Sequence, residues 1–245
     1  MPFFKITYNQ KYRFATLHNT GCTYHCDVCS YKIHSGADGV PGQVYPKPER
    51  FLAVDHMKTV LRSVPFDKLL FMGGEPTVAK ELPEMLDFGK NTLGVKTYLG
   101  HTNGSRLPLP NLDGANVGLK AWDEQTHLRY TGRPRKPIFD NFAAAVQAEL
   151  DMKANVVFIP GFVDLDQIEA IAEWLATLNA DIPFHIMGYI PVPGQPFVRP
   201  TAEQMDGAVR VCQRHLRHVA RSHLTTDEAR DLTCRSDMFQ VEQIA

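Results

Sequence analysis

Three of the five cysteines are crowded into one short segment near the N-terminus. They are Cys22, Cys26 and Cys29, with the spacing C-x3-C-x2-C. Thiolates are soft ligands that suit iron–sulfur clusters and zinc, so these side chains can close around one metal centre. Three thiolates leave one iron of a four-iron cluster without a protein ligand, and a catalytic metal needs such an open position. The spacing also fits a structural loop, or a zinc site completed by His18, His25 or His34.

A second motif that could do chemistry is Gly73-Gly74-Glu75-Pro76, which directly follows the apolar run Leu69–Met72. Glycines let a backbone approach a ligand closely, and the carboxylate of Glu75 could pair with an ammonium group. Taken alone, the same residues could be a plain turn at the end of a strand.

Polar residues also follow the next two expected strands. Thr102 and Asn103 come at the end of one strand, and Lys120 comes just after the other. Ligands of α/β folds gather at the carboxyl ends of parallel strands, so we expect these residues to face the same mouth as Glu75. The simpler alternatives are a tight turn at 102–104 and a solvated surface lysine.

Short β-rich runs alternate with helical patterns, which is typical of βα units and a parallel sheet. The expected strands are Arg13–Leu17, Lys68–Met72, Lys96–Thr102, Asn116–Leu119, Asn155–Ile159 and Phe184–Met187. The expected helices are Val54–Ser63, Lys80–Asn91, Pro137–Met152, Leu165–Leu178 and Ala202–Arg221. These units predict an α/β fold, a partial (βα)6 barrel with parallel strands that is open laterally, because a closed eight-unit barrel typically needs about 250 residues.

We expect the barrel core to span residues 1–222 and a tail to span 223–245. The tail is expected to hold a short helix, because Thr225 and Glu228 have the spacing of a capping box. Residues 30–50 are rich in glycine and proline and have no periodicity, so they are expected to form a long functional loop such as a lid.

The cysteine spacing and the Gly-Gly-Glu-Pro motif together resemble the radical S-adenosylmethionine (SAM) superfamily. The resemblance implies an enzyme with a [4Fe–4S] cluster on Cys22, Cys26 and Cys29, whose open iron binds SAM. An electron from the cluster would cleave SAM, and the resulting 5′-deoxyadenosyl radical would abstract a hydrogen atom from the substrate. In such an enzyme the cofactors perform the chemistry, and the protein binds, orients and shields them.

Within this superfamily the chain is similar to the activating enzymes of glycyl radical enzymes, such as pyruvate formate-lyase activase, over about residues 13–195. Their T-N-G and D-L-K segments correspond to Thr102-Asn103-Gly104 and Gly118-Leu119-Lys120. The resemblance implies a set of SAM contacts. Gly73, Gly74, Glu75 and Pro76 would hold the amino group, Lys120 would pair with the carboxylate, Thr102 and Asn103 would line the methionine or ribose, and Val28 would lie beside the adenine.

Several positions depart from the pattern of the activases. His101 and Gly118 stand where activases carry aspartates, which argues against the monovalent-cation site of some activases. Gly188-Tyr189-Ile190 lacks the histidine expected near SAM, and Val28 replaces a common aromatic residue. These departures weaken the likeness to activases far more than the likeness to the superfamily.

Composition limits the partners and the compartment. The 26 basic and 27 acidic residues give a net charge of −1, so no overall field favours nucleic acid or an anionic membrane. No window approaches 18 apolar residues and Met1–Lys5 lacks the apolar run of a signal peptide, so we expect no membrane partner and a reducing cytoplasm. Cys212 is expected to be a packed core thiol, and Cys234 lies in the tail.

Two readings of the substrate remain open. In one, the enzyme installs a glycyl radical on a protein partner. In the other, it acts on a small molecule or a nucleotide, and the loop at 30–50 closes over that substrate. This loop and the proline-rich segment Pro191–Pro196 favour the second reading, and His185 and Met187 could then touch the substrate. Either oxidoreductase would need an electron donor such as flavodoxin or ferredoxin.

Overall fold

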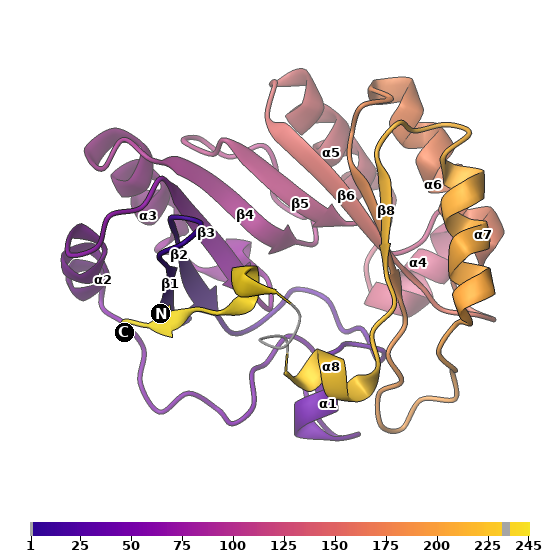
Figure 1. The fold of residues 1–245 in the computed structure, drawn as a ribbon, viewed down its shortest axis with the longest axis horizontal. Coiled ribbons are helices and arrows are strands. Elements are labelled where there is room, and N and C mark those ends of the chain that lie inside the picture. The colour runs from indigo at the N-terminus through magenta and orange to yellow at the C-terminus, as the bar shows by residue number, and fades with distance from the viewer. Residues whose placement is uncertain (1, 232–235) are drawn as a thin grey trace.

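The computed structural model describes residues 2–231 and 236–245. Within these residues the chain forms one nine-stranded sheet, in the order β8-β7-β6-β5-β4-β3-β2-β1-β9 (Figure 1). The strands are β1 (Phe3–Asn9), β2 (Phe14–Asn19), β3 (Lys68–Gly73), β4 (Lys96–Thr102), β5 (Gly114–Gly118), β6 (Asp151–Phe158), β7 (Phe184–Gly188), β8 (Val219–Ser222) and β9 (Glu242–Gln243). Strands β2 to β8 are parallel, whereas β1 and β9 run antiparallel at one edge. The expected open, mostly parallel α/β fold is confirmed.

Helices cover one face of the curved sheet, which we call the outer face; the opposite face is the inner face. The helices are α1 (Lys32–Ser35), α2 (Val54–Arg62), α3 (Leu82–Asp87), α4 (Glu124–Thr131), α5 (Lys136–Gln147), α6 (Leu165–Leu178), α7 (Ala202–Cys212) and α8 (Thr226–Arg230). Helices α2, α3, α5, α6 and α7 lie along the outer face, and α1 and α8 lie near each other beyond the sheet (Figure 1).

The hydrophobic core lies between the outer face and the helices. In β6 the alternate residues Met152, Ala154, Val156 and Phe158 are buried, as expected for a strand with one face packed. Helix α6 buries Ile168, Ile171, Ala172 and Leu175, whose spacing of three to four residues places them on one side of a helix. Burial of each large aliphatic side chain contributes about 1.5–3 kcal/mol. The inner face is therefore not covered by these helices.

The six expected parallel strands are present, but the structure corrects four other expectations. The expected helix Pro137–Met152 ends at Gln147, and Asp151 and Met152 begin β6. The strand β1 was missed. The expected helix Ala202–Arg221 ends at Cys212, and Val219–Ser222 instead forms β8, a seventh parallel strand paired with β7. The expected helix Lys80–Asn91 begins at Leu82. Pro83 lies in its first turn, where the backbone N–H that proline lacks would have no partner within the helix. The last turn of this helix is a π-helix at Phe88–Thr92.

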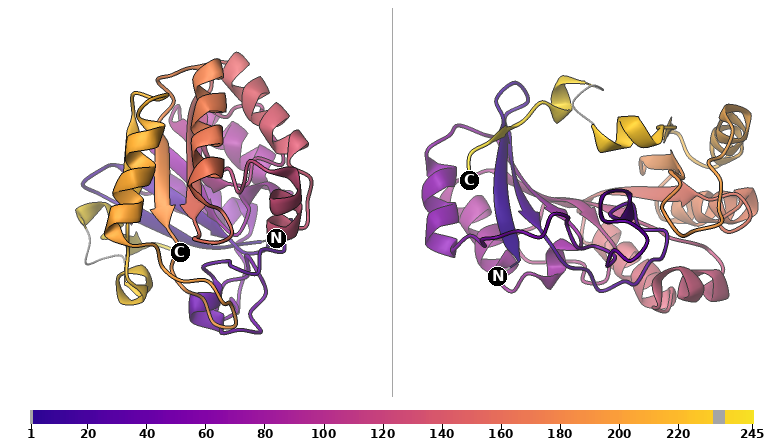
Figure 2. Two further views of the ribbon diagram at one scale, coloured as in Figure 1. Left: turned by 90° about the vertical axis from the view of Figure 1, so that its right-hand side faces the viewer. Right: turned by 90° about the horizontal axis from the view of Figure 1, so that it is seen from below.

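The described parts of the tail lie at two places: α8 (Thr226–Arg230) lies near α1, and β9 lies at the edge of the sheet beside β1 (Figures 1 and 2). Near β8, the guanidinium of Arg199 donates to the carbonyls of His223 (2.6 Å) and Leu224 (2.8 Å). Helix α8 follows, with the expected capping box of Thr225 and Glu228. Beyond it, β9 pairs with β1 at the far edge. The division of the chain at residue 222 stays a prediction.

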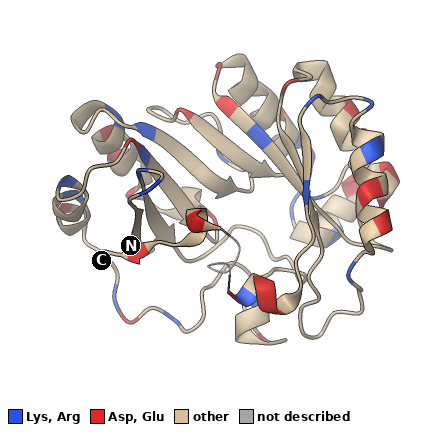
Figure 3. Cartoon of the chain, viewed as in Figure 1, with Lys and Arg blue, Asp and Glu red and all other residues tan. Residues whose placement is uncertain are grey.

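The amide of Asn9 also holds the end of the tail. The Nδ2 of Asn9 donates to the carbonyls of Asp237 (2.9 Å), Met238 (3.2 Å) and Gln240 (3.1 Å). In the view of Figure 3, acidic and basic residues are interspersed over the elements. No helix in the described part of the chain is long and apolar enough to cross a membrane. Cys234 lies outside the described residues.

Candidate functional site

The cysteine loop begins where β2 ends at Asn19 and leads into α1. The N–H of Cys29 donates to the carbonyl of Cys26 (3.1 Å), and the N–H of Lys32 donates to the carbonyl of Cys29 (3.0 Å). The N–H of His25 donates to the carbonyl of Thr131 at the end of α4 (3.0 Å). These bonds fix the loop at the carboxyl ends of the parallel strands.

The thiols of the loop are partly or fully buried. Burial raises the pKa of Cys26 to about 12, and the charge of Lys120 opposes that shift. Burial also raises the pKa of Cys22, whose Sγ accepts hydrogen bonds from the N–H of Tyr24 (3.4 Å) and the Nδ2 of Asn103 (3.8 Å). A bound metal removes the thiol proton outright, and these donors then face the thiolate.

The three thiols fit an iron–sulfur cluster in their chemistry. The charge of the Cys29 thiolate raises the pKa of Cys22 and Cys26, so the thiols lie near one another. Among residues 2–231 and 236–245, however, no three His, Cys, Asp or Glu side chains are already close enough together to hold one metal ion. In a tetrahedral zinc site, thiolates lie about 3.8 Å apart, since each Zn–S bond is about 2.3 Å. In a four-iron cluster each thiolate binds a different iron, so the thiolates stand further apart.

Glu75 links the end of β3 to the end of β4. Its side chain is 0% exposed. Its carboxylate accepts hydrogen bonds from the hydroxyl of Thr77 (2.8 Å), the hydroxyl of Thr102 (2.8 Å) and the N–H of Asn103 (2.6 Å). Burial raises the pKa of Glu75, and the hydrogen bonds from Asn103 and Thr77 oppose the shift. The carboxylate thus holds the Thr-Asn-Gly segment in place.

The two glycines before Glu75 lie against protein backbone. A Cβ on Gly73, which has a φ of 141°, would lie 2.0 Å from the carbonyl oxygen of Asn19. A Cβ on Gly74 would lie 2.2 Å from the oxygen of Gly21 and 2.3 Å from that of Gly42. Real side chains do not approach so closely, so glycine at both positions lets β3, the cysteine loop and the 30–50 loop meet.

Asn103 joins the end of β4 to the cysteine loop. Its Nδ2 donates to the hydroxyl of Thr23 (2.9 Å) as well as to Cys22 Sγ, and its carbonyl accepts from the hydroxyl of Tyr24 (3.3 Å). Its Oδ1 accepts from the N–H of Ser105 (2.9 Å). With the backbone N–H that donates to Glu75, all four polar groups of Asn103 are therefore used within the site.

Lys120 brings a positive charge to the cysteines. Its Nζ lies 2.8 Å from the place that a Cβ on Gly118 would occupy, so glycine at 118 makes room for the ammonium. The ammonium also lies 6.0 Å from the ring centroid of Tyr130. Among the described residues, no carboxylate forms an ion pair with Lys120.

The structure brings most of the expected site residues together. Cys22, Glu75, Thr102 and Asn103 are joined by hydrogen bonds, directly or through one another, and Lys120 lies within electrostatic reach of Cys22 and Cys26. Val28 and Pro76 are buried. Sequence reasoning missed Thr77 and Tyr24. The position of Thr77 two residues after Glu75 was a usable signal, because an acidic N-cap accepts from the N–H two or three residues later.

Comparison with known proteins decides the family. A family model of the radical SAM superfamily matches residues 16–175, more than half of the chain. The chain belongs to the radical SAM superfamily. Members of this superfamily use SAM and a [4Fe–4S] cluster, which agrees with the three clustered cysteines.

Two curated relatives show how far the likeness extends. A candidate glycyl-radical enzyme activating enzyme of Methanocaldococcus jannaschii is 31% identical over 183 residues, which cover 71% of this chain and 67% of the relative. A GTP 3′,8-cyclase of Stenotrophomonas maltophilia is 28% identical over 180 residues, which cover 67% of this chain and 50% of the relative. This radical SAM chain therefore spans from half to two thirds of the lengths of these relatives.

Solved structures support the same fold. A radical SAM methyltransferase from Sphaerobacter thermophilus matches with a TM-score of 0.60 at 18% identity, over 91% of this chain and 70% of its own. Streptococcus suis SuiB bound to S-adenosylmethionine matches with a TM-score of 0.62 at 15% identity, over 89% of this chain and 52% of its own. At these identities the likeness concerns the fold alone.

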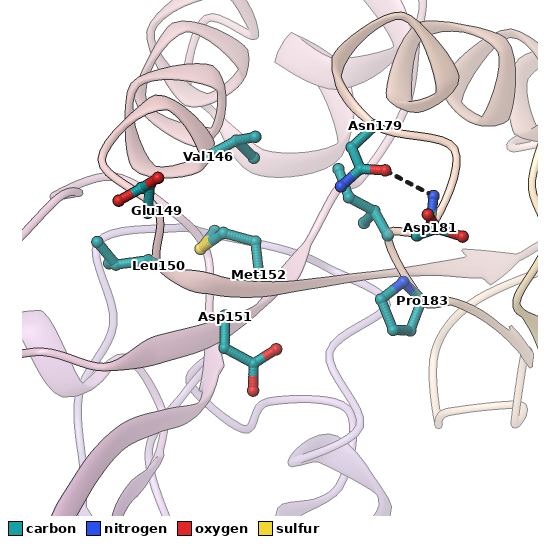
Figure 4. Close-up of a pocket in the computed structure, with 9 residues that line it drawn as sticks. Val146, Glu149, Leu150, Asp151, Met152, Asn179, Asp181 and Pro183 are labelled. Carbon is teal, nitrogen blue, oxygen red and sulfur yellow. Dashed lines mark hydrogen bonds between the residues drawn. The ribbon is translucent and has the colours of Figure 1, made fainter.

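One indentation lies at the other end of the sheet. Its volume is about 350 Å³, and it is lined at the amino ends of β6 and β7 by Asp151 and Pro183, with Glu149 and Asp181 nearby (Figure 4). Because ligands of parallel sheets bind at the carboxyl ends, this indentation is separate from the radical SAM site.

Proposed function

We propose that this radical SAM protein holds one [4Fe–4S] cluster on Cys22, Cys26 and Cys29 and abstracts a hydrogen atom from a small molecule or a nucleotide. When bound, the cluster and SAM supply the 5′-deoxyadenosyl radical. The observation that carries the proposal is the joint arrangement of the cysteine loop, Glu75 and Asn103 at the carboxyl ends of β2, β3 and β4.

The chain's own residues bind and orient the cofactors in this proposal. Lys120 supplies the charge that would pair with the SAM carboxylate. Glu75 positions Thr102 and Asn103 through hydrogen bonds, and Gly73 and Gly74 bring their strand against the cysteine loop. Asn103 and Tyr24 donate to Cys22 Sγ and would stabilise its thiolate.

The surroundings of the mouth support a small substrate. Gly42 in the 30–50 loop accepts a hydrogen bond from the N–H of Gly21 (2.8 Å), next to Cys22. The same loop meets the proline-rich segment, where a Cβ on Gly194 would lie 3.1 Å from the Cβ of Ala37. In the tail, α8 lies near α1, which directly follows the cysteine loop. These segments narrow the approach to the site, and a reactive carbon radical needs such shielding from water.

A second function is favoured by a different observation. The 31% identity to a candidate glycyl-radical enzyme activating enzyme supports a protein substrate on which a glycyl radical is installed. A protein substrate would have to pass the tail, so this function predicts that the tail moves away from β1 when the partner binds.

Anaerobic reconstitution with iron and sulfide tests the proposal. The reconstituted protein should contain about four irons per chain, as one cluster requires. With SAM and a reductant it should form 5′-deoxyadenosine, and a true small-molecule substrate should increase that rate. Tightly bound zinc without iron, or no 5′-deoxyadenosine from the reconstituted protein, would contradict the proposal.

A further inference from the structure

Two asparagine side chains meet on the inner face of the sheet, where β5 and β6 lie side by side (Figure 1). The Nδ2 of Asn155 donates to the Oδ1 of Asn116 (2.8 Å). Asn116 stands between Ala115 and Val117, which are buried on the outer face, so strand alternation places its side chain on the inner face. Among the described residues, this amide pair makes no hydrogen bond to the cysteine loop, so the site described above does not account for it.

The hydrogen bond leaves one amide group available to a ligand. Asn116 accepts through its Oδ1, so its Nδ2, which carries two N–H donors, points away from Asn155. Within the part of the chain that the structure describes, this Nδ2 has no hydrogen-bond acceptor, and the side chain is only half-buried. A donor that is held in a fixed orientation and is reached by solvent suits a ligand with an oxygen acceptor.

Lys153 adds a positive charge beside this donor. Lys153 pairs with Asn116 in the register of β5 and β6, so the two residues lie opposite each other on strands about 4.8 Å apart. Its neighbours Met152 and Ala154 are buried on the outer face, so Lys153 belongs to the inner face, where it is exposed. Its ammonium forms no ion pair with a carboxylate in the described ranges of the chain.

The acidic residue on the same face of β6 lies over a different position. Asp151 pairs with Gly114, and a Cβ on Gly114 would lie 2.9 Å from the Cβ of Asp151 and 2.8 Å from the Cε1 of Tyr98. Asp151 and Tyr98 therefore fill the space above Gly114, and the charge of Asp151 helps to raise the pKa of Tyr98. Asp151 does not cover Asn116 or Lys153.

The amide pair also connects this place to the mouth of the sheet. Asn155 pairs with Gly118, and the position of a Cβ on Gly118 lies 3.4 Å from the Oδ1 of Asn155 and 2.8 Å from the Nζ of Lys120. Along β6, Lys153 lies two residues, or about 7 Å, further from the mouth than Asn155. A small molecule that lies along this line has one end at Lys153 and the other beside Lys120, where the proposed function locates SAM.

We propose that Asn116 and Lys153 bind an anionic oxygen group of the substrate, a carboxylate or a phosphate, on the inner face of β5 and β6. One oxygen accepts from the Nδ2 of Asn116, and another pairs with the ammonium of Lys153. Asn155 is a positioning residue that fixes the orientation of the Asn116 amide. This inference rests on the proposed function and narrows its substrate to small anionic molecules.

Calorimetric titration of the reconstituted protein tests the inference with three probes, which are acetate, inorganic phosphate and the neutral acetamide. Each titration is done with and without SAM. We expect the parent protein to bind at least one of the two anions. It should bind acetamide at least about tenfold more weakly than that anion, because acetamide lacks the charge that pairs with Lys153.

Two variants test the donor and the charge separately. Asn116→Asp keeps an oxygen that accepts from Asn155 but replaces the Nδ2 donor with an anionic oxygen, so the folded variant should lose anion binding. Lys153→Met removes the ammonium from an exposed side chain, so anion affinity should fall about tenfold while SAM affinity stays unchanged. The control Lys136→Met should bind like the parent, because Lys136 lies on α5 over the outer face, where it pairs with Asp140 (2.6 Å).

The outcomes separate this inference from the function on which it rests. The inference is wrong if the parent binds neither anion, if acetamide binds as tightly as the anions, or if either inner-face variant binds the anion as the parent does. If the parent fails to bind SAM, the proposed function is wrong, and the titrations without SAM still decide whether the anion site exists. The anion that binds more tightly identifies the group as a carboxylate or a phosphate.

Discussion

The carboxylate of Glu75 accepts a 2.6 Å hydrogen bond from the backbone N–H of Asn103, a residue 28 positions further along the chain. This bond joins the end of β3 to the end of β4. Asn103 in turn donates to Cys22 Sγ, so the carboxylate is connected to the cysteine loop through one residue. A buried carboxylate with this many donors shapes the site even before any ligand is bound.

Replacement of Glu75 by alanine should therefore affect both stability and SAM binding. The change leaves the N–H groups of Asn103 and Thr77 and the hydroxyl of Thr102 without their acceptor. Each buried unsatisfied donor typically costs about 1–3 kcal/mol, so the free energy of unfolding should fall by several kcal/mol in a denaturant titration. The affinity for SAM should fall as well, because Thr102 and Asn103 lose their fixed positions.

Glu84→Ala is a matched control for this prediction. Glu84 lies on α3, where its carboxylate pairs with the ammonium of Lys58 (2.6 Å), and its side chain is 55% exposed. An exposed pair of this kind contributes little to stability, so the control should keep SAM affinity and nearly all its stability. Parent-like SAM affinity in a folded Glu75→Ala protein would remove Glu75 from the SAM site.

The cluster should depend on three of the cysteines and not on the fourth described one. Alanine at Cys22, Cys26 or Cys29 should abolish the visible absorbance of the reconstituted cluster and the formation of 5′-deoxyadenosine. Cys212→Ala is the control, because Cys212 is buried in α7 and its thiol contacts the carbonyl of Ile168 (3.9 Å). Iron retained by a triple variant of the loop cysteines would place the metal elsewhere.

Motifs predicted the location of the site, and tertiary contacts decided its details. The spacing of the cysteines, the position of Glu75 and the place of Lys120 after β5 could all be derived from the sequence, since parallel strands end at one edge. The full burial of Glu75 could not, because it depends on Thr77 and Asn103 folding around the carboxylate. From the sequence alone, a carboxylate next to two glycines is expected to be exposed to solvent.

The missed and misplaced elements have a common cause. The spacing of Leu216 and Val219 continues the apolar stripe of α7, so periodicity alone extends the helix to Arg221. In the structure the N–H of Phe184 donates to the carbonyl of His218 (2.8 Å), and pairing with β7 prevails over helical propensity. Strand β1 was missed for a related reason. It is stabilised by antiparallel pairing with β2, and the sequence of a short segment does not show such pairing.

The stability of the fold should fall on acidification, in part through His18. Its imidazole bonds with the hydroxyl of Thr7 (2.8 Å), and burial, assisted by the charge of Lys5, lowers its pKa from 6.5 to about 4. The folded state binds this proton more weakly than the unfolded chain does. The stabilising contribution is therefore complete above about pH 6.5 and is lost as the pH falls to about 4, by roughly 3 kcal/mol at most.

Thermal unfolding of the His18→Gln protein, measured anaerobically between pH 7 and pH 4.5, checks this linkage. The melting temperature of the variant should fall less steeply with pH than that of the parent. His56→Gln, a change at an exposed histidine of α2, should follow the parent. Identical pH dependence in all three proteins would mean that His18 does not contribute to acid sensitivity.

Two glycines of the 30–50 loop allow the contact between this loop and the cluster ligands to be tested. Gly36 and Gly42 both have positive φ, of 84° and 72°, so alanine strains the backbone at both. Their surroundings differ. A Cβ on Gly42 would lie 2.3 Å from the Cβ of Cys22, whereas a Cβ on Gly36 would meet nothing within 4 Å.

Gly42→Ala should therefore displace the loop from Cys22, and Gly36→Ala should not. We expect the Gly42 variant to lose a substantial part of its iron after reconstitution. Per remaining cluster, it should form more 5′-deoxyadenosine that is uncoupled from product, because a displaced loop shields the radical less well. The Gly36 variant should match the parent in iron content and coupling. Equal behaviour of the two variants would show that the loop only connects β2 to α2, and that its contact with Cys22 has no part in holding the cluster or in shielding the radical.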